Sequence, residues 1–359
     1  MRKQLSIFLI LILSISISSY AMEVKVGDFG IITPVSFGAK GDGVTDDSPA
    51  FRLAASAIPN EGGIFFIPVP PVKYYIKTPI VFTQKRIIIR GAGHGSLLWT
   101  DKDITVLDIN PTSPYEGGTV LEDFAIEGNR AGDNQTGIRV RKVTKSWRMS
   151  GIKTTNLKSV GVLVEDSRWG NLHELYITGS GIGLYLYGNA EDVTITRVIG
   201  GCFGPGNGIG IQSDRVEGLK IEGAAIQGNT INGILMRGGY QNELSNLYIS
   251  DNPINISVTT HPTYGVMRGL HIHDLFLGSG TPGRVNIKLD GDKQTLIDGA
   301  GYWQINASDG KHLTITPNSI SPVLSLSGVY AGGIDLSRPE VLTQYPNIFD
   351  VNNTGIVWK

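Results

Sequence analysis

The stretch Gly137-Ile138-Arg139-Val140 decides the fold, because the same phrase returns along the middle of the chain. Each copy is a glycine followed by apolar residues at every second position, and the glycines recur every 22 to 25 residues. A fixed period of this length is the signature of a solenoid of stacked repeats. The further copies are Gly161-Val162-Leu163-Val164, Gly183-Leu184-Tyr185-Leu186, Gly208-Ile209-Gly210-Ile211 and Gly233-Ile234-Leu235-Met236.

Each repeat also carries a second apolar stretch with the period of a β-strand, such as Leu175-Tyr176-Ile177 or Leu247-Tyr248-Ile249. Turn residues such as Gly228-Asn229 follow these stretches, and no helical pattern lies between them. Two or three short strands per repeat predict an all-β fold, a right-handed parallel β-helix. A leucine-rich horseshoe has a similar period, but its fixed frame has no place for the Gly-Ile-x-Ile strand of the same repeat.

The alternation within the glycine phrase predicts which side chains point inward. The interior column is expected to contain Ile138, Val162, Leu184, Ile209 and Ile234. Two columns then point outward from the same strands. The first consists of Arg139, Leu163, Tyr185, Gly210 and Leu235, and the second of Arg141, Glu165, Tyr187, Gln212 and Arg237.

The first 21 residues have the pattern of a cleaved secretion signal. A basic start at Arg2 and Lys3 precedes an apolar run, and Ser19-Tyr20-Ala21 provides a small-x-small cleavage site. The run is too short and too rich in serine for a stable membrane span. We therefore expect a secreted or periplasmic protein. The rest of the chain, residues 22–359, is expected to form one domain with an N-terminal cap (22–63), coils (64–300) and a C-terminal cap region (301–359).

The amino-acid composition indicates which kinds of partner the protein can bind. The 31 basic and 32 acidic residues give a formal net charge of −1, and loss of Arg2 and Lys3 with the signal makes the chain more acidic. This balance argues against a nucleic-acid partner, which requires a basic footprint. The single cysteine, Cys202, cannot form an internal disulfide. We expect it to be a buried filler in its repeat.

The segment from Val35 to Phe66 predicts a cap for the first coil. Gly41-Asp42-Gly43 is a turn, Asp46, Asp47 and Ser48 can cap a helix start, and Pro49 suits its first turn. The three aspartates are therefore expected to be structural and not catalytic. The short helix has an apolar face made of Ala50, Phe51, Leu53, Ala54, Ala57 and Ile58.

This segment resembles the opening of the pectate-lyase-like right-handed β-helix superfamily, through Gly41-Asp42-Gly43-x-Thr45-Asp46-Asp47. The superfamily includes rhamnogalacturonases, polygalacturonases, phage tailspike depolymerases and uronate epimerases. The resemblance implies an extracellular or cell-surface polysaccharide as partner, and it is compatible with a homo-oligomer. The chain departs from the polygalacturonase signature, because the coils lack its Asn-Thr-Asp and Asp-Asp motifs and Gly93-His94-Gly95 lies on an early coil without them. Fold analogy leaves the reaction open.

Three functions remain open at this stage. The first is a polysaccharide glycoside hydrolase acting in a groove along the coils. The second is a polysaccharide lyase or a uronate C5-epimerase, in which arginines would neutralise the substrate carboxylate. The third is a glycan-binding or adhesin-type β-helix without catalysis. No cofactor is expected from the sequence, and no metal, since His271-Ile272-His273-Asp274 lacks an evident further ligand.

The candidate catalytic groups are the carboxylates that follow the glycine phrase: Asp166, Asp214 and Glu165. Coils stack at about 4.8 Å, so Asp166 and Asp214, two coils apart, would lie about 9–10 Å from each other if they share a register. That separation is at the long edge of the roughly 6.5–9.5 Å window for an inverting glycosidase. Both are expected outside the coil interior. The expected sugar-binding residues, aromatic or cationic, are Arg168, Trp169, Tyr187, Arg215, Arg237 and Tyr240.

Overall fold

The chain forms a right-handed parallel β-helix, as the repeats predict. The computed structural model describes residues 30–112, 117–201, 206–279 and 285–290, and the later stretches 292–293, 296–298, 301–305, 311–315, 324–326, 329–332 and 348–350. Side chains are described for residues 30–112, 117–201, 206–278 and 285–289. The predicted signal sequence and Cys202 lie outside these ranges. By its contacts the chain divides into Met1–Ile31 and Ile32–Lys359, and the second unit contains the β-helix.

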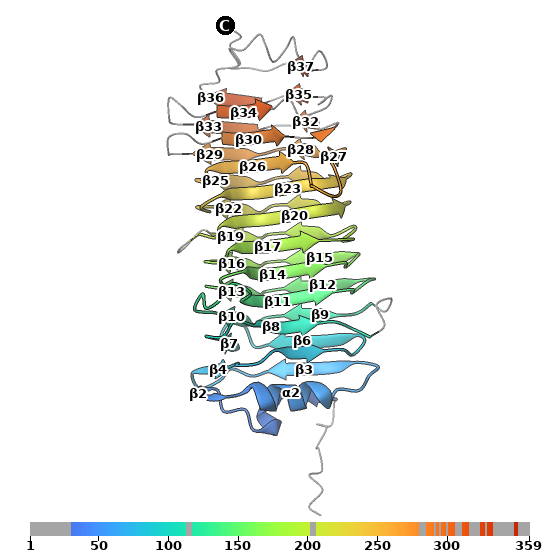
Figure 1. Ribbon diagram of the computed structural model, residues 1–359, viewed down its shortest axis with the longest axis vertical. Helices are drawn as coiled ribbons and strands as arrows, with labels where there is room; N and C mark the ends of the chain where they lie inside the picture. Colours follow the sequence, from blue (N-terminus) through green and yellow to red (C-terminus); the bar gives the residue numbers. More distant parts are fainter. Residues whose placement is uncertain are drawn as a thin grey trace, which may run out of the picture. The chain divides into compact units, whose positions relative to one another are not determined.

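Three long parallel sheets form the walls of the β-helix, and Figure 1 shows their strands stacked coil upon coil. Sheet A has the order β1 (Ile31–Ile32), β3 (Gly63–Ile67), β6 (Ile87–Gly91), β9 (Val120–Glu122), β12 (Trp147–Ser150), β15 (Gly170–His173), β18 (Thr194–Thr196), β21 (Lys220–Glu222), β24 (Glu243–Ser245), β28 (His271–His273) and β32 (Leu296–Asp298).

Sheet B follows sheet A within each coil, and its strands are short. Its order is β2 (Asp42–Asp46), β4 (Lys73–Tyr75), β7 (Leu97–Trp99), β10 (Ala125–Glu127), β13 (Lys153–Thr155), β16 (Tyr176–Thr178), β19 (Ile199–Gly200), β22 (Ala225–Gln227), β25 (Tyr248–Ser250), β29 (Phe276–Ser279), β33 (Gly301–Ile305) and β36 (Val329–Gly332).

Sheet C contains the glycine phrase and the longest strands. Its order is β5 (Ile80–Phe82), β8 (Thr105–Ile109), β11 (Thr136–Arg141), β14 (Val160–Glu165), β17 (Ile182–Tyr187), β20 (Ile209–Glu217), β23 (Asn232–Tyr240), β26 (Ile254–Thr259), β30 (Val285–Asp290) and β34 (Lys311–Ile315). Two short strands, β27 (Met267–Arg268) and β31 (Asp292–Lys293), continue it beside β23, and β35 (Leu324–Leu326) pairs with β37 (Ile348–Asp350).

The predicted interior column is confirmed at four positions and wrong at the fifth. Ile138, Val162, Leu184 and Ile234 pair in register and are fully buried, but the residue between Leu184 and Ile234 is Ile211. Ile209 lies two residues earlier and is only half-buried.

The reason for this register lies in the glycine that precedes each interior residue. The glycines before Ile138, Val162, Leu184, Ile211 and Ile234 form a column in which a Cβ on each would lie 2.6 Å from a carbonyl oxygen of the next coil. The phrase Gly208-Ile209-Gly210-Ile211 contains two glycines, and only one of them can lie in this column. In the structure it is Gly210.

The corners between the sheets differ in how the chain turns. From sheet A to sheet B, each coil from β9 to β28 turns on one residue with positive φ. These residues are Asp123, Gly151, Glu174, Arg197, Gly223, Asn246 and Asp274. From sheet B to sheet C, buried asparagines stack on one another, and Asn229 donates from its side chain to Asn252 Oδ1 at 2.8 Å. These bonds satisfy polar groups that the corner would otherwise bury without partners.

The cap helix α2 (Ser48–Ser56) closes the first coil, after the 3-10 helix η1 (Pro34–Phe37). Phe51 is fully buried and its ring centroid lies 5.0 Å from that of Tyr74. Ala50, Ala54 and Ile58 are also buried, as predicted. Leu53, however, is 54% exposed and does not belong to the apolar face.

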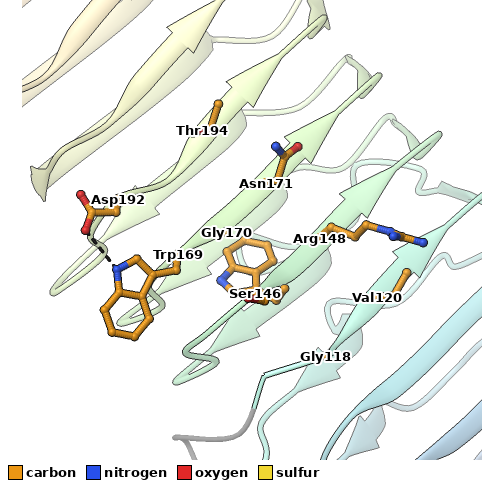
Figure 2. Close-up of a pocket in the computed structure, with 10 residues that line it drawn as sticks. Gly118, Val120, Ser146, Arg148, Trp169, Gly170, Asn171, Asp192 and Thr194 are labelled. Carbon is orange, nitrogen blue, oxygen red and sulfur yellow. Dashed lines mark hydrogen bonds between the residues drawn. The ribbon is translucent and has the colours of Figure 1, made fainter.

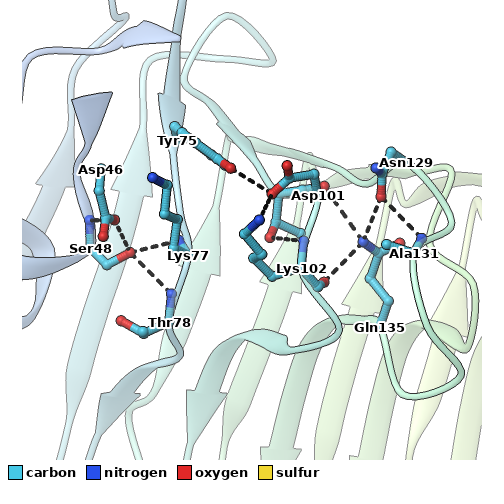
Figure 3. A network of polar contacts seen from close by, with 11 residues as sticks. Asp46, Ser48, Tyr75, Lys77, Thr78, Asp101, Lys102, Asn129, Ala131 and Gln135 are labelled. Atoms are coloured by element: carbon cyan, nitrogen blue, oxygen red, sulfur yellow. Dashed lines mark hydrogen bonds and ion pairs between the residues drawn. The ribbon is translucent and has the colours of Figure 1, made fainter. Parts of the chain in front are cut away.

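The aspartates of the cap make structural contacts, although not all of them in the predicted way. Asp46 accepts from the Ser48 amide at 3.0 Å, and Ser48 Oγ accepts from the backbone of the next coil (Figure 3). Asp47 stands at the N-cap position but does not cap α2, because its carboxylate accepts from the amides of Lys40, Gly41 and Tyr75. Backbone hydrogen bonds, from Thr45 first, lower the pKa of Asp42 to about 2.

No helix in the part of the chain that the structure describes combines the length and apolarity needed to cross a membrane.

Candidate functional site

The outer face of sheet C carries two columns of polar and aromatic side chains. In the first column, Tyr185 is followed by Gln212, where the sequence predicted Gly210. In the second column, Tyr187 is followed by Asp214, where the sequence predicted Gln212. The corrected columns are Asp108, Arg139, Leu163, Tyr185, Gln212 and Leu235, and then Arg141, Glu165, Tyr187, Asp214 and Arg237.

Asp214 is 1% exposed, and its carboxylate is fully engaged. Arg237 donates to it from Nε at 2.6 Å and from Nη2, Tyr185 donates its hydroxyl at 2.6 Å, and Gln212 donates at 3.3 Å. The hydrogen bond to Asp214 raises the pKa of Arg237, and burial followed by the bond to Asp214 raises the pKa of Tyr185. Asp214 thus holds Arg237 and Tyr185 in fixed positions.

Because Asp214 is buried and hydrogen-bonded, a substitution there should lower the free energy of unfolding. We expect Asp214→Asn to lower the free energy of unfolding by about 2 kcal/mol, because it removes charged hydrogen bonds and turns an amide towards Arg237. The Arg237 side chain is 34% exposed, so water limits the loss. Asp166→Asn is the matched control and should cost under about 1 kcal/mol. Equal shifts in urea unfolding of the two variants would contradict this account.

A second cluster of the same kind lies four coils earlier. Asp108 is 4% exposed and binds two arginines, with Arg139 Nη2 at 2.9 Å and Arg141 Nη2 at 2.8 Å from its Oδ2. The sequence analysis missed this cluster. The sequence contained one signal for this cluster. Asp108 is at an outward position of its strand, and Arg139 is at the same position one coil later.

Glu165 lies between these two clusters. It pairs in register with Arg141 on one side and Tyr187 on the other, and its side chain is half-buried. Its carboxylate has no hydrogen-bond or ion-pair partner among the described residues, although its backbone carbonyl accepts from Ser167 Oγ at 2.9 Å. Its charge contributes to the raised pKa of Arg139, after the larger contribution of Asp108. Glu165 is therefore an available carboxylate on a face where Asp108 and Asp214 are fixed.

Asp166 does not share a register with Asp214. It follows Glu165 directly, adopts a left-handed conformation with φ of 47°, and stands in line with Gly188 and Arg215. Its Oδ1 accepts from the Asn189 amide at 2.9 Å, which is a turn contact. The predicted pairing of Asp166 with Asp214 rested on a shared register that the structure does not have.

The C-terminal ends of the sheet C strands carry several of the predicted sugar-binding residues. Arg215 lies 4.4 Å from the ring centroid of Tyr264, whose ring stacks on His261 at 4.5 Å. Tyr240 is 37% exposed and lies beside Arg268. Tyr187 packs against Tyr185 with 5.8 Å between ring centroids. The sequence analysis missed Tyr264, because its loop has no counterpart in the other repeats.

Arg168 and Trp169 lie apart from these residues, at the start of sheet A. Arg168 forms an ion pair with Glu191 at 2.9 Å, and Trp169 Nε1 donates to Asp192 Oδ2 at 3.1 Å (Figure 2). Trp169 also lines a groove on the outer face of sheet A, with a volume of about 620 Å³.

The histidines of β28 share one strand face. The rings of His271 and His273 stack with 4.4 Å between centroids, and His273 contacts Asp274 at 2.8 Å and Glu243 at 3.2 Å. Burial lowers the pKa of His273, but these two hydrogen bonds outweigh it and raise the pKa above 6.5. Across the described residues, no three His, Cys, Asp or Glu side chains come together in a way that suits a metal ion.

Comparison with solved structures supports the fold. No protein-family model matches the sequence, and no curated protein is significantly similar to it. The A-module of mannuronan C-5 epimerase AlgE4 from Azotobacter vinelandii aligns with a TM-score of 0.60 and 15% identity, over 84% of this chain and 96% of that one. The catalytic unit of a GH87 alpha-1,3-glucanase from Streptomyces thermodiastaticus aligns with a TM-score of 0.50 and 17% identity, over 85% and 69%.

A viral protein, ORF18 of Geobacillus virus E2, aligns with a TM-score of 0.56 and 16% identity. The alignment covers 86% of this chain, and this chain spans only 62% of the viral protein. At these identities the likeness shows a common right-handed β-helix, the fold that the N-terminal motif implied.

Proposed function

We propose that the chain acts on an acidic polysaccharide laid along the outer face of sheet C, and that Glu165 abstracts the proton at C5 of a uronate residue. The observation that carries this proposal is the contrast among three carboxylates of one face. Arginines bind Asp108 and Asp214, whereas the carboxylate of Glu165 between them has no partner among the described residues. A carboxylate that exchanges a proton with substrate must be free to do so.

The arginines of this face suit an anionic substrate. Arg139, Arg141 and Arg237 lie in the same two columns as Asp108, Glu165 and Asp214, so arginines line the face on both sides of Glu165. A guanidinium has five N–H donors, and the described contacts of Arg237 with Asp214 use only its Nε and Nη2 groups. Its Nη1 group can therefore bind a substrate carboxylate, which lowers the energy of the carbanion formed at C5.

The reaction follows from these positions. Glu165 takes the C5 proton, and the electron pair of the C5–H bond moves towards the uronate carboxylate. In elimination, this pair forms the C4=C5 double bond while the C4–O bond breaks, and the leaving oxygen takes a proton from Tyr187 or from water. In epimerisation, Tyr187 or water gives a proton to C5 from the opposite side, and Glu165 later loses its proton to solvent. Structural similarity to a mannuronan C-5 epimerase supports this reaction class.

Glycoside hydrolysis is a second candidate, favoured by one observation. Glu165 and Asp214 occupy the same column two coils apart, which places their backbones about 10 Å from each other. Inverting glycosidases use carboxylates about 6.5–9.5 Å apart. The contacts of Asp214 weigh against this reaction, because all of its oxygen lone pairs are already in use.

A polysaccharide panel in D₂O tests the proposal. The wild-type protein is incubated with polygalacturonate, alginate, hyaluronan, dextran and laminarin, and three signals are followed: unsaturated-uronate absorbance, new reducing ends, and deuterium at C5. We expect absorbance with new ends for elimination, or deuterium without new ends for epimerisation, on a uronate polymer. New ends without absorbance or deuterium would indicate hydrolysis, and no signal would indicate binding alone. Either of these results would overturn the C5 proposal.

A further inference from the structure

The groove on the outer face of sheet A is separate from the face that carries Glu165. Its lining comes from four successive coils, because Val120, Arg148, Asn171 and Thr194 belong to β9, β12, β15 and β18. Four coils span about 14 Å along the axis of the β-helix. With a volume of about 620 Å³, the groove is of the size that holds small organic ligands.

Trp169 forms one wall of the groove and is unusual for its position. The side chain is 47% exposed, and its backbone has a positive φ of 55°. The residues in line with it on neighbouring coils are small or polar: Ser146, Asp192, Gly218 and Gln241. These residue types suit a left-handed turn, whereas a bulky aromatic residue is rare there. Turn geometry therefore does not account for a tryptophan.

The neighbours of Trp169 hold its ring in place. Its Nε1 donates to Asp192 on the next coil at 3.1 Å, so one edge of the indole is anchored while a face stays accessible (Figure 2). Below it, Trp147 is 1% exposed and forms the floor, with Nε1 donating to the carbonyl of Arg168 at 3.0 Å. Gly170 leaves room for this floor, because a Cβ there would overlap the Trp147 ring.

The other lining residues offer hydrogen-bonding groups, and the lining as a whole has no net charge. The lining contains one cation, Arg148, and one anion, Asp192, and their charges cancel. The side chains of Asn171 and Thr194 have no protein partner within the described ranges and are exposed or half-buried. An aromatic wall with amide, hydroxyl and guanidinium groups in a neutral groove is complementary to the flat face and hydroxyl groups of a sugar ring.

We propose that this groove is a second glycan-binding site, which holds two or three pyranose units of a polysaccharide with one unit stacked on Trp169. One pyranose unit is close in length to one coil step of about 4.8 Å, so successive units would meet successive coils. The site binds and does not cleave. Its effect is to keep a polymer near sheet C, which raises the apparent affinity for long chains and leaves short ones unaffected.

Affinity electrophoresis in gels containing laminarin, dextran, alginate or polygalacturonate tests this site. We expect at least one polymer to retard the wild-type protein, and Trp169→Ala to weaken that binding about tenfold, the scale of one aromatic contact. Tyr248→Ala is the matched control, because Tyr248 is a 41% exposed aromatic residue on sheet B, and it should be retarded like the wild type. Unfolding curves of both variants verify that they fold.

A second readout is intrinsic fluorescence. Oligosaccharides of the retarding polymer should shift tryptophan emission in the wild type and not in Trp169→Phe. Unchanged retardation of Trp169→Ala, or no retardation of the wild type by any polymer, would overturn the groove proposal. Glu165→Gln should still be retarded, so a failure of this site and a failure of the C5 chemistry give different results.

Discussion

Glu165→Gln is expected to lower the turnover of a uronate polysaccharide by a factor of about 10² to 10⁴, the usual cost of losing a positioned proton-transfer group. Glutamine keeps the size of the side chain and removes its capacity to take a proton. Because the carboxylate of Glu165 has no hydrogen-bond or ion-pair partner among the described residues, the change leaves no buried group without a partner. The melting temperature should therefore stay close to that of the wild type. Turnover is measured on the polymer that gives the strongest wild-type signal.

Glu127→Gln is the matched control for this experiment. Glu127 is also a half-buried glutamate on an outer face, but it belongs to β10 of sheet B. The same substitution there should leave turnover within about twofold of the wild type, as expected for a surface site away from the chemistry. If Glu165→Gln retains full activity, Glu165 is not the base.

Ile211→Asp should unfold the protein or nearly so. Ile211 is 1% exposed in the middle of the interior column, so the change places an unpaired charge among apolar side chains and removes their packing. The expected loss in the free energy of unfolding is on the order of 5 kcal/mol or more, which matches the lower end of the total stability of a domain. Urea unfolding followed by circular dichroism measures it.

Ile209→Asp tests the register of β20, because the sequence predicted that Ile209, and not Ile211, lies in the interior column. Ile209 is half-buried and pairs with Ile182 and Asn232, so a carboxylate there keeps contact with water. We expect a loss of about 1 kcal/mol, typical of a partly exposed position. A larger loss at Ile209 than at Ile211 would mean that the register is shifted by two residues.

The sequence predicted most of the fold because the glycine phrase reports a steric requirement. A glycine is needed wherever a Cβ would meet the next coil, and that need repeats from β11 to β23. The predicted register was wrong in β20, where two residues, Gly208 and Gly210, could each supply the required glycine. Alternation has a period of two residues, so the apolar pattern fits both registers equally well. Only the packing of neighbouring coils distinguishes them.

The candidate site was less predictable for the same reason. Counting from Gly208 placed Asp214 within one residue of the position of Asp166, whereas counting from Gly210 places it in line with Glu165. The arginine clusters depend on contacts between coils, which a pattern within one coil does not contain. Asp108 and Arg139 are 31 residues apart, and their bond follows only from the pairing of β8 with β11. The residue types indicated which side chains could form the site. Which side chains contact one another could be known only from the register between coils.

The corners of the coil differ in their tolerance to added sequence. The corner between sheets A and B uses one left-handed residue per coil, so an added residue there would break the pairing of both sheets. The corner after sheet C already accommodates a longer excursion, residues 260–266, between β26 and β27, closed by a bridge between His261 and Gly265. Foreign peptides could be displayed at its exposed tip, Pro262 and Thr263, without altering the stacked strands. The β-helix is in this sense a scaffold whose specificity can be exchanged loop by loop.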